Sequence, residues 1–235
     1  MVDPAAIQAR LANVRDRVAR AAGRAGRDPA SVRLVAVSKT FTAEHVRAAA
    51  AAGQPDFGEN KVQEGLQKIS QTADLEIRWH LVGHLQSNKA RKAGAGFDVV
   101  HSIDAVALVG TLDEAAEAAG RRIELLVQVD LAGESTKHGA SERHLPPIFD
   151  AGRRCRAARI VGLMLLPPAT DDPDGARPYF RALRDVRDRL LARGVDGSML
   201  KELSMGMSHD FEVAIEEGST IVRVGTAIFG ERTYV

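Results

Sequence analysis

Lys39 is the side chain of this sequence that is best placed for covalent chemistry. It follows an apolar, β-branched run over residues 32–38, which is typical of a buried strand. Burial disfavours the charged form of an amine, and a neutral amine can attack an aldehyde to form a Schiff base. The alternative is a lysine that ends the strand and reaches water, and the run alone does not separate the two.

Two segments near the end of the chain suit an anion. Ser208 stands where a predicted helix begins, and Gly225 and Thr226 end the last predicted strand. Hydroxyls and backbone N–H groups bind phosphate, and a glycine lets a ligand approach the backbone closely. The simpler interpretation is that Ser208 is a helix N-cap and Gly225 marks a turn. Asp210, expected in the first turn of the same helix, would repel a phosphate unless it points away.

Arg223 precedes Gly225 by two residues, so both lie on one face of the predicted strand. An arginine is almost never buried without a partner. If that face lines a cavity, the guanidinium points either at a carboxylate of the protein or at a ring nitrogen or phosphate of a ligand.

Other polar groups give weaker signals. His80 and His84 are four residues apart, but they lie in a predicted strand without a third ligand, so we expect no metal site. Lys89, Arg91 and Lys92 are interpreted as one solvated helix face.

The composition indicates an ordinary globular chain. Of its 235 residues, 45% are hydrophobic and 27% are charged, and the net charge is +1. We therefore expect no nucleic-acid partner and no broad attraction to anionic lipid. No apolar stretch is long enough for a membrane helix, and the N-terminus does not read as a signal peptide, so we expect a cytoplasmic protein. Cys155 is the only cysteine, which excludes an internal disulfide.

Strand-like and helix-like patterns alternate along the chain. After a first helix within residues 1–26, capped by Asp3 and Pro4, strands are predicted over 32–38, 55–59, 77–83, 97–103, 122–130, 159–166, 199–206 and 220–226. The intervening helices are predicted over 44–52, 61–70, 87–93, 105–119, 145–157, 175–193 and 209–217.

Strict alternation predicts parallel strands with helical crossovers. Eight such units in a chain of this length favour an α/β fold of the (β/α)8 TIM-barrel type over an open, doubly wound sheet. We expect a single domain over residues 1–235, with the N-terminal helix packing on the barrel. In such barrels functional residues lie at the carboxyl ends of the strands, where Lys39, Asn60 and Thr226 are expected.

Several longer blocks give the sequence a family resemblance. The blocks are residues 34–40, 57–64, 79–89, 203–210 and 223–230. In these the chain resembles the pyridoxal phosphate homeostasis proteins, the YggS/PROSC family, over nearly its whole length. Leu165 and Leu166 depart from the pattern, because the family often has a smaller or polar residue there.

The resemblance implies a fold-type III barrel like the N-terminal domain of alanine racemase. It implies that Lys39 holds pyridoxal 5′-phosphate (PLP) as a Schiff base. It also implies that Arg223 faces the pyridine nitrogen and that Asn60 lies near the ring. Ser208, Gly225 and Thr226 would hold the phosphate.

An arginine beside the pyridine nitrogen leaves that nitrogen neutral and weakens amino-acid chemistry. A racemase would also need a second base. We expect that base to come from another domain or subunit, since Tyr179 and Tyr234, the only tyrosines, lie at no predicted strand end.

The first hypothesis is therefore a non-catalytic protein of intracellular PLP homeostasis, a monomer or weak dimer that passes PLP to apoenzymes. The alternatives are an amino-acid racemase and a Schiff-base aldolase acting on a sugar phosphate.

Overall fold

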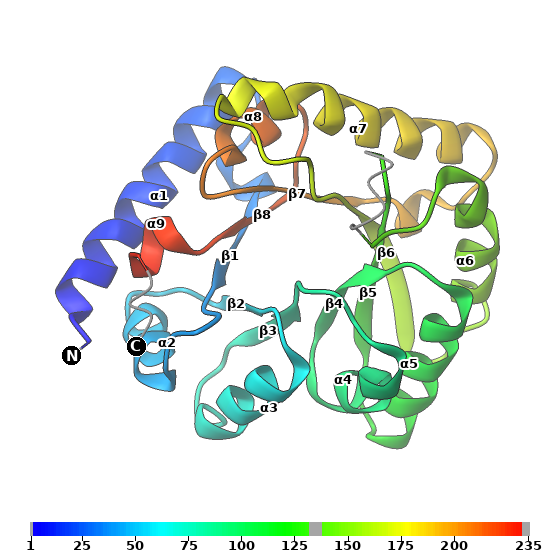
Figure 1. Ribbon diagram of the computed structural model, residues 1–235, viewed down its shortest axis with the longest axis horizontal. Helices are drawn as coiled ribbons and strands as arrows, with labels where there is room; N and C mark the ends of the chain where they lie inside the picture. The colour runs from blue at the N-terminus through cyan, green and yellow to red at the C-terminus, as the bar shows by residue number, and fades with distance from the viewer. Residues whose placement is uncertain (1, 132–137, 232–235) are drawn as a thin grey trace.

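The protein folds as a closed barrel of eight parallel strands in the order β1 to β8 (Figure 1). The computed structural model describes residues 2–131 and 138–231. The strands are β1 (Arg33–Val37), β2 (Asp56–Glu59), β3 (Arg78–Leu81), β4 (Val99–Ile103), β5 (Ile123–Gln128), β6 (Ala158–Met164), β7 (Glu202–Met207) and β8 (Ile221–Val224). Each overlaps its predicted strand, and the pairing of β1 with β8 closes the barrel, so the predicted TIM barrel is confirmed.

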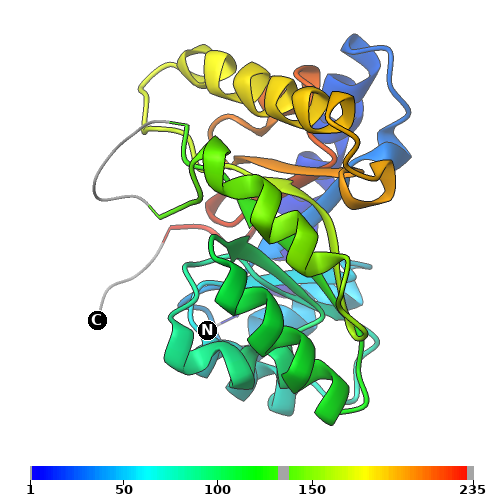
Figure 2. The ribbon, with the colours of Figure 1, turned by 90° about the vertical axis from the view of Figure 1, so that its right-hand side faces the viewer.

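Helices surround the barrel (Figures 1 and 2). They are α1 (Pro4–Arg24), α2 (Ala43–Ala51), α3 (Val62–Gln71), α4 (Ala90–Gly96), α5 (Val106–Ala118), α6 (Leu145–Gly152), α7 (Arg177–Ala192), α8 (Phe211–Glu216) and α9 (Thr226–Phe229). In the described part of the chain, no helix combines the length and the apolar character needed to cross a membrane.

Helix α1 precedes the first barrel unit and lies against the outside of the barrel, next to α8, α2 and α9. Asp3 accepts a hydrogen bond from the Ala6 amide at 3.1 Å and Pro4 follows it, as the sequence predicts for a helix start. Ile7, Leu11 and Val14 are buried on the face that meets the barrel. The additional N-terminal helix is thus part of the packed structure.

Helix α6 ends at Gly152, five residues before the predicted end. The carboxylate of Asp113, on α5, accepts hydrogen bonds from the amides of Arg156, Ala157 and Ala158 at 2.8 to 3.2 Å. These amides are therefore bound to a side chain of another helix and do not continue α6. A tertiary contact of this kind leaves no periodic signal in the sequence.

The barrel strands separate two apolar clusters. The larger one lies between the strands and the helices and contains most of the buried side chains. The smaller one consists of Val35, Val99, Leu126, Val161, Met164 and Ile221. Because successive strand residues point to opposite faces, Val99 and Ile221 place His101 and Arg223 on the inner face as well. His80 pairs with Val99 and Ser204 with Met164, so both point to the same face. One part of the barrel interior is therefore polar.

Candidate functional site

A cavity of about 510 Å³ opens at the carboxyl ends of the strands, within the usual size range of small-molecule sites. Its walls include all six residues that the sequence suggested for a ligand: Lys39, Asn60, Ser208, Arg223, Gly225 and Thr226. Val37, Phe41, Val82, Leu166 and Met207 add apolar surface. The structure thus brings together side chains that lie far apart in the sequence.

Lys39 lies in a tight turn just after β1. The Phe41 amide donates to the Ser38 carbonyl oxygen at 3.0 Å and closes a turn over residues 38–41. Thr40, the third residue of this turn, has a φ of 70°. A β-branched residue in this left-handed region is strained by about 1–3 kcal/mol, so surrounding contacts must hold it there.

Three charged side chains supply those contacts, and we call Glu59, Glu64 and Lys68 the clamp. Glu64 accepts a hydrogen bond from the Thr40 amide at 2.6 Å. The Lys68 ammonium donates to the Ser38 carbonyl at 2.8 Å and to Glu59 and Glu64 at 2.6 and 2.8 Å. The Ser38 hydroxyl donates to Glu59 at 2.7 Å. The clamp therefore fixes the residues on both sides of Lys39.

The clamp is built from buried charges. Burial raises the pKa of Glu59 to about 6, although the bonds from Lys68 and Ser38 act in the opposite direction. Burial also acts to raise the pKa of Glu64, but Lys68 and the Thr40 amide together hold it below its usual value. Lys68 is 5% exposed, so its charge depends on these two carboxylates.

Ser208 and Gly225 meet at the part of the cavity wall that follows β7 and β8, and β8 is paired with β1. The Ser208 hydroxyl accepts a hydrogen bond from the Gly225 amide at 3.1 Å, which joins the end of β7 to the end of β8. Ser208 is not a helix N-cap, because α8 begins at Phe211 and its N-cap is Asp210. Thr226 is not in the last strand but begins α9. Both residues line the cavity, but each lies in a different element from the one predicted.

Asp210 does not point at the cavity wall that Ser208 forms. Its carboxylate turns back to accept a hydrogen bond from the Met207 amide at 2.6 Å, and it is buried. Burial raises its pKa above the usual value. The geometry therefore removes most of the expected conflict between Asp210 and an anion.

Arg223 is buried at the base of the cavity and has an uncommon set of partners. Its guanidinium donates to the Ser204 hydroxyl at 2.5 Å and to the Leu165 carbonyl oxygen at 2.9 Å. Burial lowers its pKa to about 10, and the charge of Asp210 acts in the opposite direction. Within the described residues it forms no ion pair with a carboxylate. An arginine carries five N–H donors, so donors remain beyond these two bonds.

Leu165 and Leu166, which the sequence analysis singled out, contribute to the site in different ways. Leu165 contacts Arg223 through its backbone oxygen, and its side chain is buried in the outer cluster. Leu166 lines the cavity and adds apolar surface. The side chain at position 165 therefore does not determine how the guanidinium is anchored.

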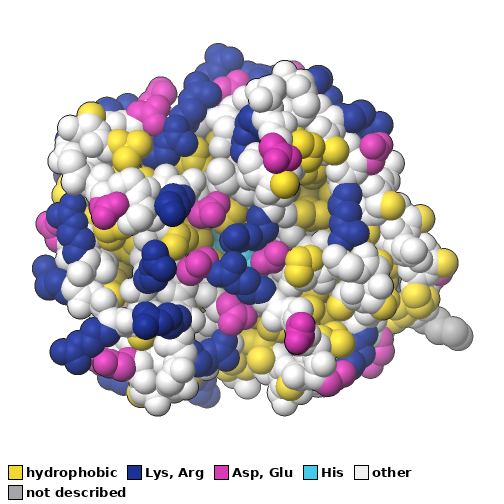
Figure 3. Space-filling model, turned by 180° about the vertical axis from the view of Figure 1, so that it is seen from behind, with side chains coloured by type: hydrophobic (Ala, Val, Ile, Leu, Met, Phe, Trp, Pro, Cys, Tyr) yellow, Lys and Arg dark blue, Asp and Glu magenta, His cyan; other side chains and the backbone are white. Residues whose placement is uncertain are grey.

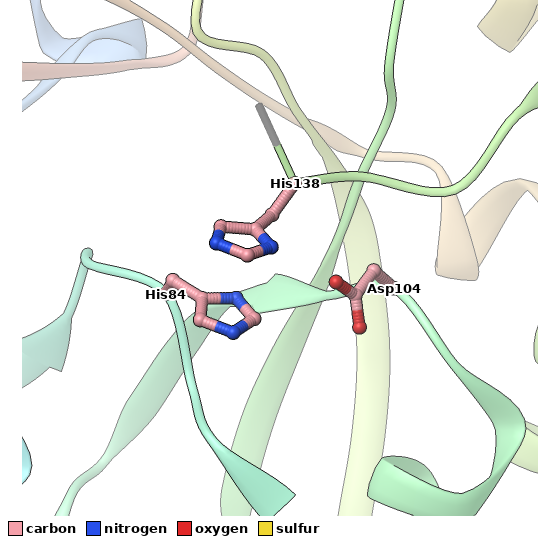
Figure 4. A group of neighbouring side chains, drawn as sticks. All are labelled: His84, Asp104 and His138. Carbon is pink, nitrogen blue, oxygen red and sulfur yellow. The ribbon is translucent and has the colours of Figure 1, made fainter. Parts of the chain in front are cut away.

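His84, Asp104 and His138 meet at the mouth of the barrel, as Figure 4 shows. One potential ligand atom from each lies within 4.8 Å of the others. The rings of His84 and His138 are stacked, with centroids 3.4 Å apart and planes at 9°. Imidazole lone pairs lie in the ring plane, so two parallel rings do not direct them at one point. His80 does not join this group, because both its ring nitrogens bond inside the barrel.

The sequence interpretation missed the clamp and the polar groups inside the barrel. One signal existed for Lys68: α3 buries Val62, Gly65 and Lys68, so a lysine occupies its buried stripe. A charge in such a stripe indicates a buried partner. Tyr179 lies on α7 and does not line the cavity, whereas Tyr234 lies outside the described residues.

Comparison with known proteins agrees with this architecture. Residues 3–233 match the family described as alanine racemase, N-terminal domain. A protein of Pseudomonas aeruginosa named pyridoxal phosphate homeostasis protein is 43% identical over 224 residues, covering 95% of each chain. The chain belongs to this family. The homeostasis protein of Aquifex aeolicus is 40% identical over 96% of this chain and 98% of its own.

A solved structure has the same fold. PipY of Synechococcus elongatus, determined with PLP bound, superimposes with a TM-score of 0.83 at 39% identity. The match covers 95% of this chain and all of PipY. The family resemblance and the alanine racemase-like barrel predicted from the sequence are confirmed.

Proposed function

We propose that this chain binds PLP in the cavity at the barrel mouth and takes part in PLP homeostasis. The chemistry of the lining residues fits the three functional parts of PLP. Lys39 offers an amine for the aldehyde, and Arg223 offers donors for an unprotonated ring nitrogen. Ser208 and Thr226 offer hydroxyls for the phosphate, and Gly225 lets the phosphate approach the backbone closely. Asn60 lies on the wall beside Lys39 and would contact the ring.

The observation that carries this proposal is the convergence of Lys39, Arg223 and Ser208 on one cavity in a chain of this family. When bound, PLP supplies an aldehyde that condenses reversibly with a primary amine. The clamp holds the backbone on both sides of that amine, and Val37 and Phe41 add apolar surface to the same cavity. The Arg223 guanidinium can only donate hydrogen bonds, so it would keep the ring nitrogen an acceptor without a proton.

We infer holding and delivery of PLP rather than turnover. A carboxylate beside the ring nitrogen would strengthen the electron sink that amino-acid chemistry requires, whereas Arg223 weakens it. No tyrosine of the described residues lines the cavity to serve as a second base. The proposed partners are PLP and PLP-dependent apoenzymes. The burial of α1 against the barrel supports our inference that residues 1–235 form a single domain.

Borohydride reduction followed by peptide mapping tests the proposal. Purified protein incubated with PLP and reduced should carry a pyridoxyl group on the peptide that contains Lys39. Lys39→Ala should lose this group, while Lys61→Ala, which removes an exposed lysine next to Asn60, should keep it. A tag found on another lysine, or on none, would refute the proposal.

Loss of the α-hydrogen of amino acids in heavy water at enzyme-like rates would instead favour the racemase alternative. Labelling of Lys39 by a sugar phosphate in place of PLP would favour the aldolase.

A further inference from the structure

Five buried polar side chains form one continuous chain of hydrogen bonds across the barrel interior. Asp56 lies 2.8 Å from Nε2 of His80, and Nδ1 of His80 lies 2.9 Å from Nε2 of His101. Nδ1 of His101 lies 2.9 Å from the Ser204 hydroxyl, which accepts from Arg223. The chain runs from the start of β2, through β3 and β4, to β7 and β8.

The chemistry of its two ends gives this chain one direction. Arg223 only donates, so the Ser204 oxygen accepts from it and its single hydrogen is left for Nδ1 of His101. At the other end, an ionised Asp56 only accepts, so His80 carries its proton on Nε2. A neutral His80 then accepts at Nδ1 from Nε2–H of His101. Both ends require the same tautomer for both histidines.

Burial is consistent with this assignment. His80, His101 and Ser204 are fully buried, and Asp56 and Arg223 are 8% and 4% exposed. Burial lowers the pKa of His80 and lowers that of His101 well below the usual value. Asp56 acts in the opposite direction on His80, whereas Arg223 also disfavours protonation of His101. Arg33 and Arg78 disfavour protonation of both rings, and Asp210 acts on Arg223.

The chain also supplies neutral partners for the buried charge of Arg223. No carboxylate of the described residues pairs with it directly, yet an isolated buried charge is unfavourable. The charge of Asp210 acts on the guanidinium, and the chain adds Asp56 at its far end, joined to Arg223 through three neutral groups with aligned donors. Such aligned bonds polarise one another and stabilise both ends.

We propose that Asp56, His80, His101 and Ser204 act as a relay that orients Arg223 and keeps it a donor toward the cavity. All four are positioning residues, since none lines the cavity. If PLP binds as in the proposed function, on which this step rests, the relay keeps the ring nitrogen of PLP unprotonated. Small changes far from the cavity would then alter the spectrum of bound PLP.

The first test is nitrogen NMR of histidine-labelled protein without PLP. Both His80 and His101 should be neutral and protonated on Nε2 from mildly acidic to mildly alkaline pH. Ser204→Ala should disturb the His101 signal, because it removes the donor at Nδ1. Ser102→Ala is a matched control: Ser102 is equally buried on the same strand as His101, and its hydroxyl has no hydrogen-bond partner in the structure.

The second test is the pH titration of the absorption spectrum of bound PLP. Ser204→Ala should raise the pH at which the ring nitrogen takes up its proton by about one unit, a tenfold change in the equilibrium. Ser102→Ala should leave the titration unchanged. Asp56→Asn, which keeps an acceptor and removes the charge, should shift it in the same direction by less, and serves if Ser204→Ala does not fold.

Two results would overturn the relay. One is a wild-type His101 protonated on Nδ1. The other is a titration in which neither Ser204→Ala nor Asp56→Asn departs from Ser102→Ala. A wild-type protein that takes up no PLP would instead refute the proposed function, and the tautomers alone would then decide on the relay.

Discussion

Two regions around the cavity hold their buried cations in different ways. Behind Lys39, the clamp pairs Lys68 directly with Glu59 and Glu64 at 2.6 and 2.8 Å. Behind Arg223, the carboxylate of Asp56 is reached only through three neutral side chains. A direct pair fixes the position of a backbone turn, whereas a chain of aligned donors fixes the direction of a hydrogen bond. The same barrel therefore uses buried charge for two separate tasks.

The largest expected effect comes from breaking the direct pair. Lys68→Met leaves Glu59 and Glu64 without their cation inside the protein and should lower the free energy of unfolding by about 3–5 kcal/mol. Urea unfolding followed by circular dichroism measures this change. Lys92→Met, at an exposed position of α4, should change stability by less than about 0.5 kcal/mol. Equal effects for the two variants would contradict the clamp.

Two glycines of the cavity wall, Gly83 and Gly225, should differ in how well they tolerate a side chain. A Cβ at Gly83 would collide with the carbonyl oxygen of Asn60, whereas one at Gly225 would lie 3.1 Å from the Val37 oxygen. Gly83→Ala should therefore destabilise the fold by about 3 kcal/mol and Gly225→Ala by less.

Thermal unfolding ranks these variants. Gly110→Ala, in helix α5 with no neighbouring atom within 4 Å, should be stabilising by about 0.5–1 kcal/mol. A Gly83→Ala variant as stable as Gly225→Ala would show that the backbone around Gly83 and Asn60 adapts equally well.

The stability contributions of the clamp and of the relay should also change with pH in opposite directions. Burial raises the folded pKa of Glu59 from 4.5 to about 6, so its penalty is absent below pH 4.5 and complete above about pH 6. The free energy of unfolding of Glu59→Gln, compared with that of wild type, should therefore increase by about 2 kcal/mol as the pH rises through this window. The folded pKa of His80 and His101 is lowered from 6.5, so their contribution is full above 6.5 and is lost as pH falls.

Comparing variant with wild type at each pH cancels the histidine contribution, because both proteins keep the relay. Urea unfolding at a series of pH values gives the difference directly. A difference that stays constant between pH 4.5 and 6.5 would mean that Glu59 is not penalised by burial.

The smallest effect concerns the proposed phosphate side. Thr226→Ala removes one hydroxyl from the cavity wall and should weaken PLP retention by about 1 kcal/mol, or roughly fivefold. Equilibrium dialysis measures retention. Thr111→Ala, at a half-buried position of α5 that does not line this cavity, should retain PLP like wild type. Unchanged retention in Thr226→Ala would count against its role.

The sequence predicted the barrel well because alternating apolar runs and helix signals are local. Lys39 and Arg223 could be assigned to the cavity from their positions at or near strand ends. The clamp and the relay could not, because their bonds join strands and helices whose register is set only on folding. Ser208 and Thr226 were assigned to the wrong elements for the same reason: the bond from the Gly225 amide to Ser208 forms between two loops.

The Leu165 carbonyl oxygen carries a broader consequence. Every residue type presents the same peptide oxygen, so substitution at this position alters packing but leaves the acceptor for Arg223 in place. Part of this binding site is therefore formed by a backbone atom, whose position depends on the fold and not on the residue type at that position.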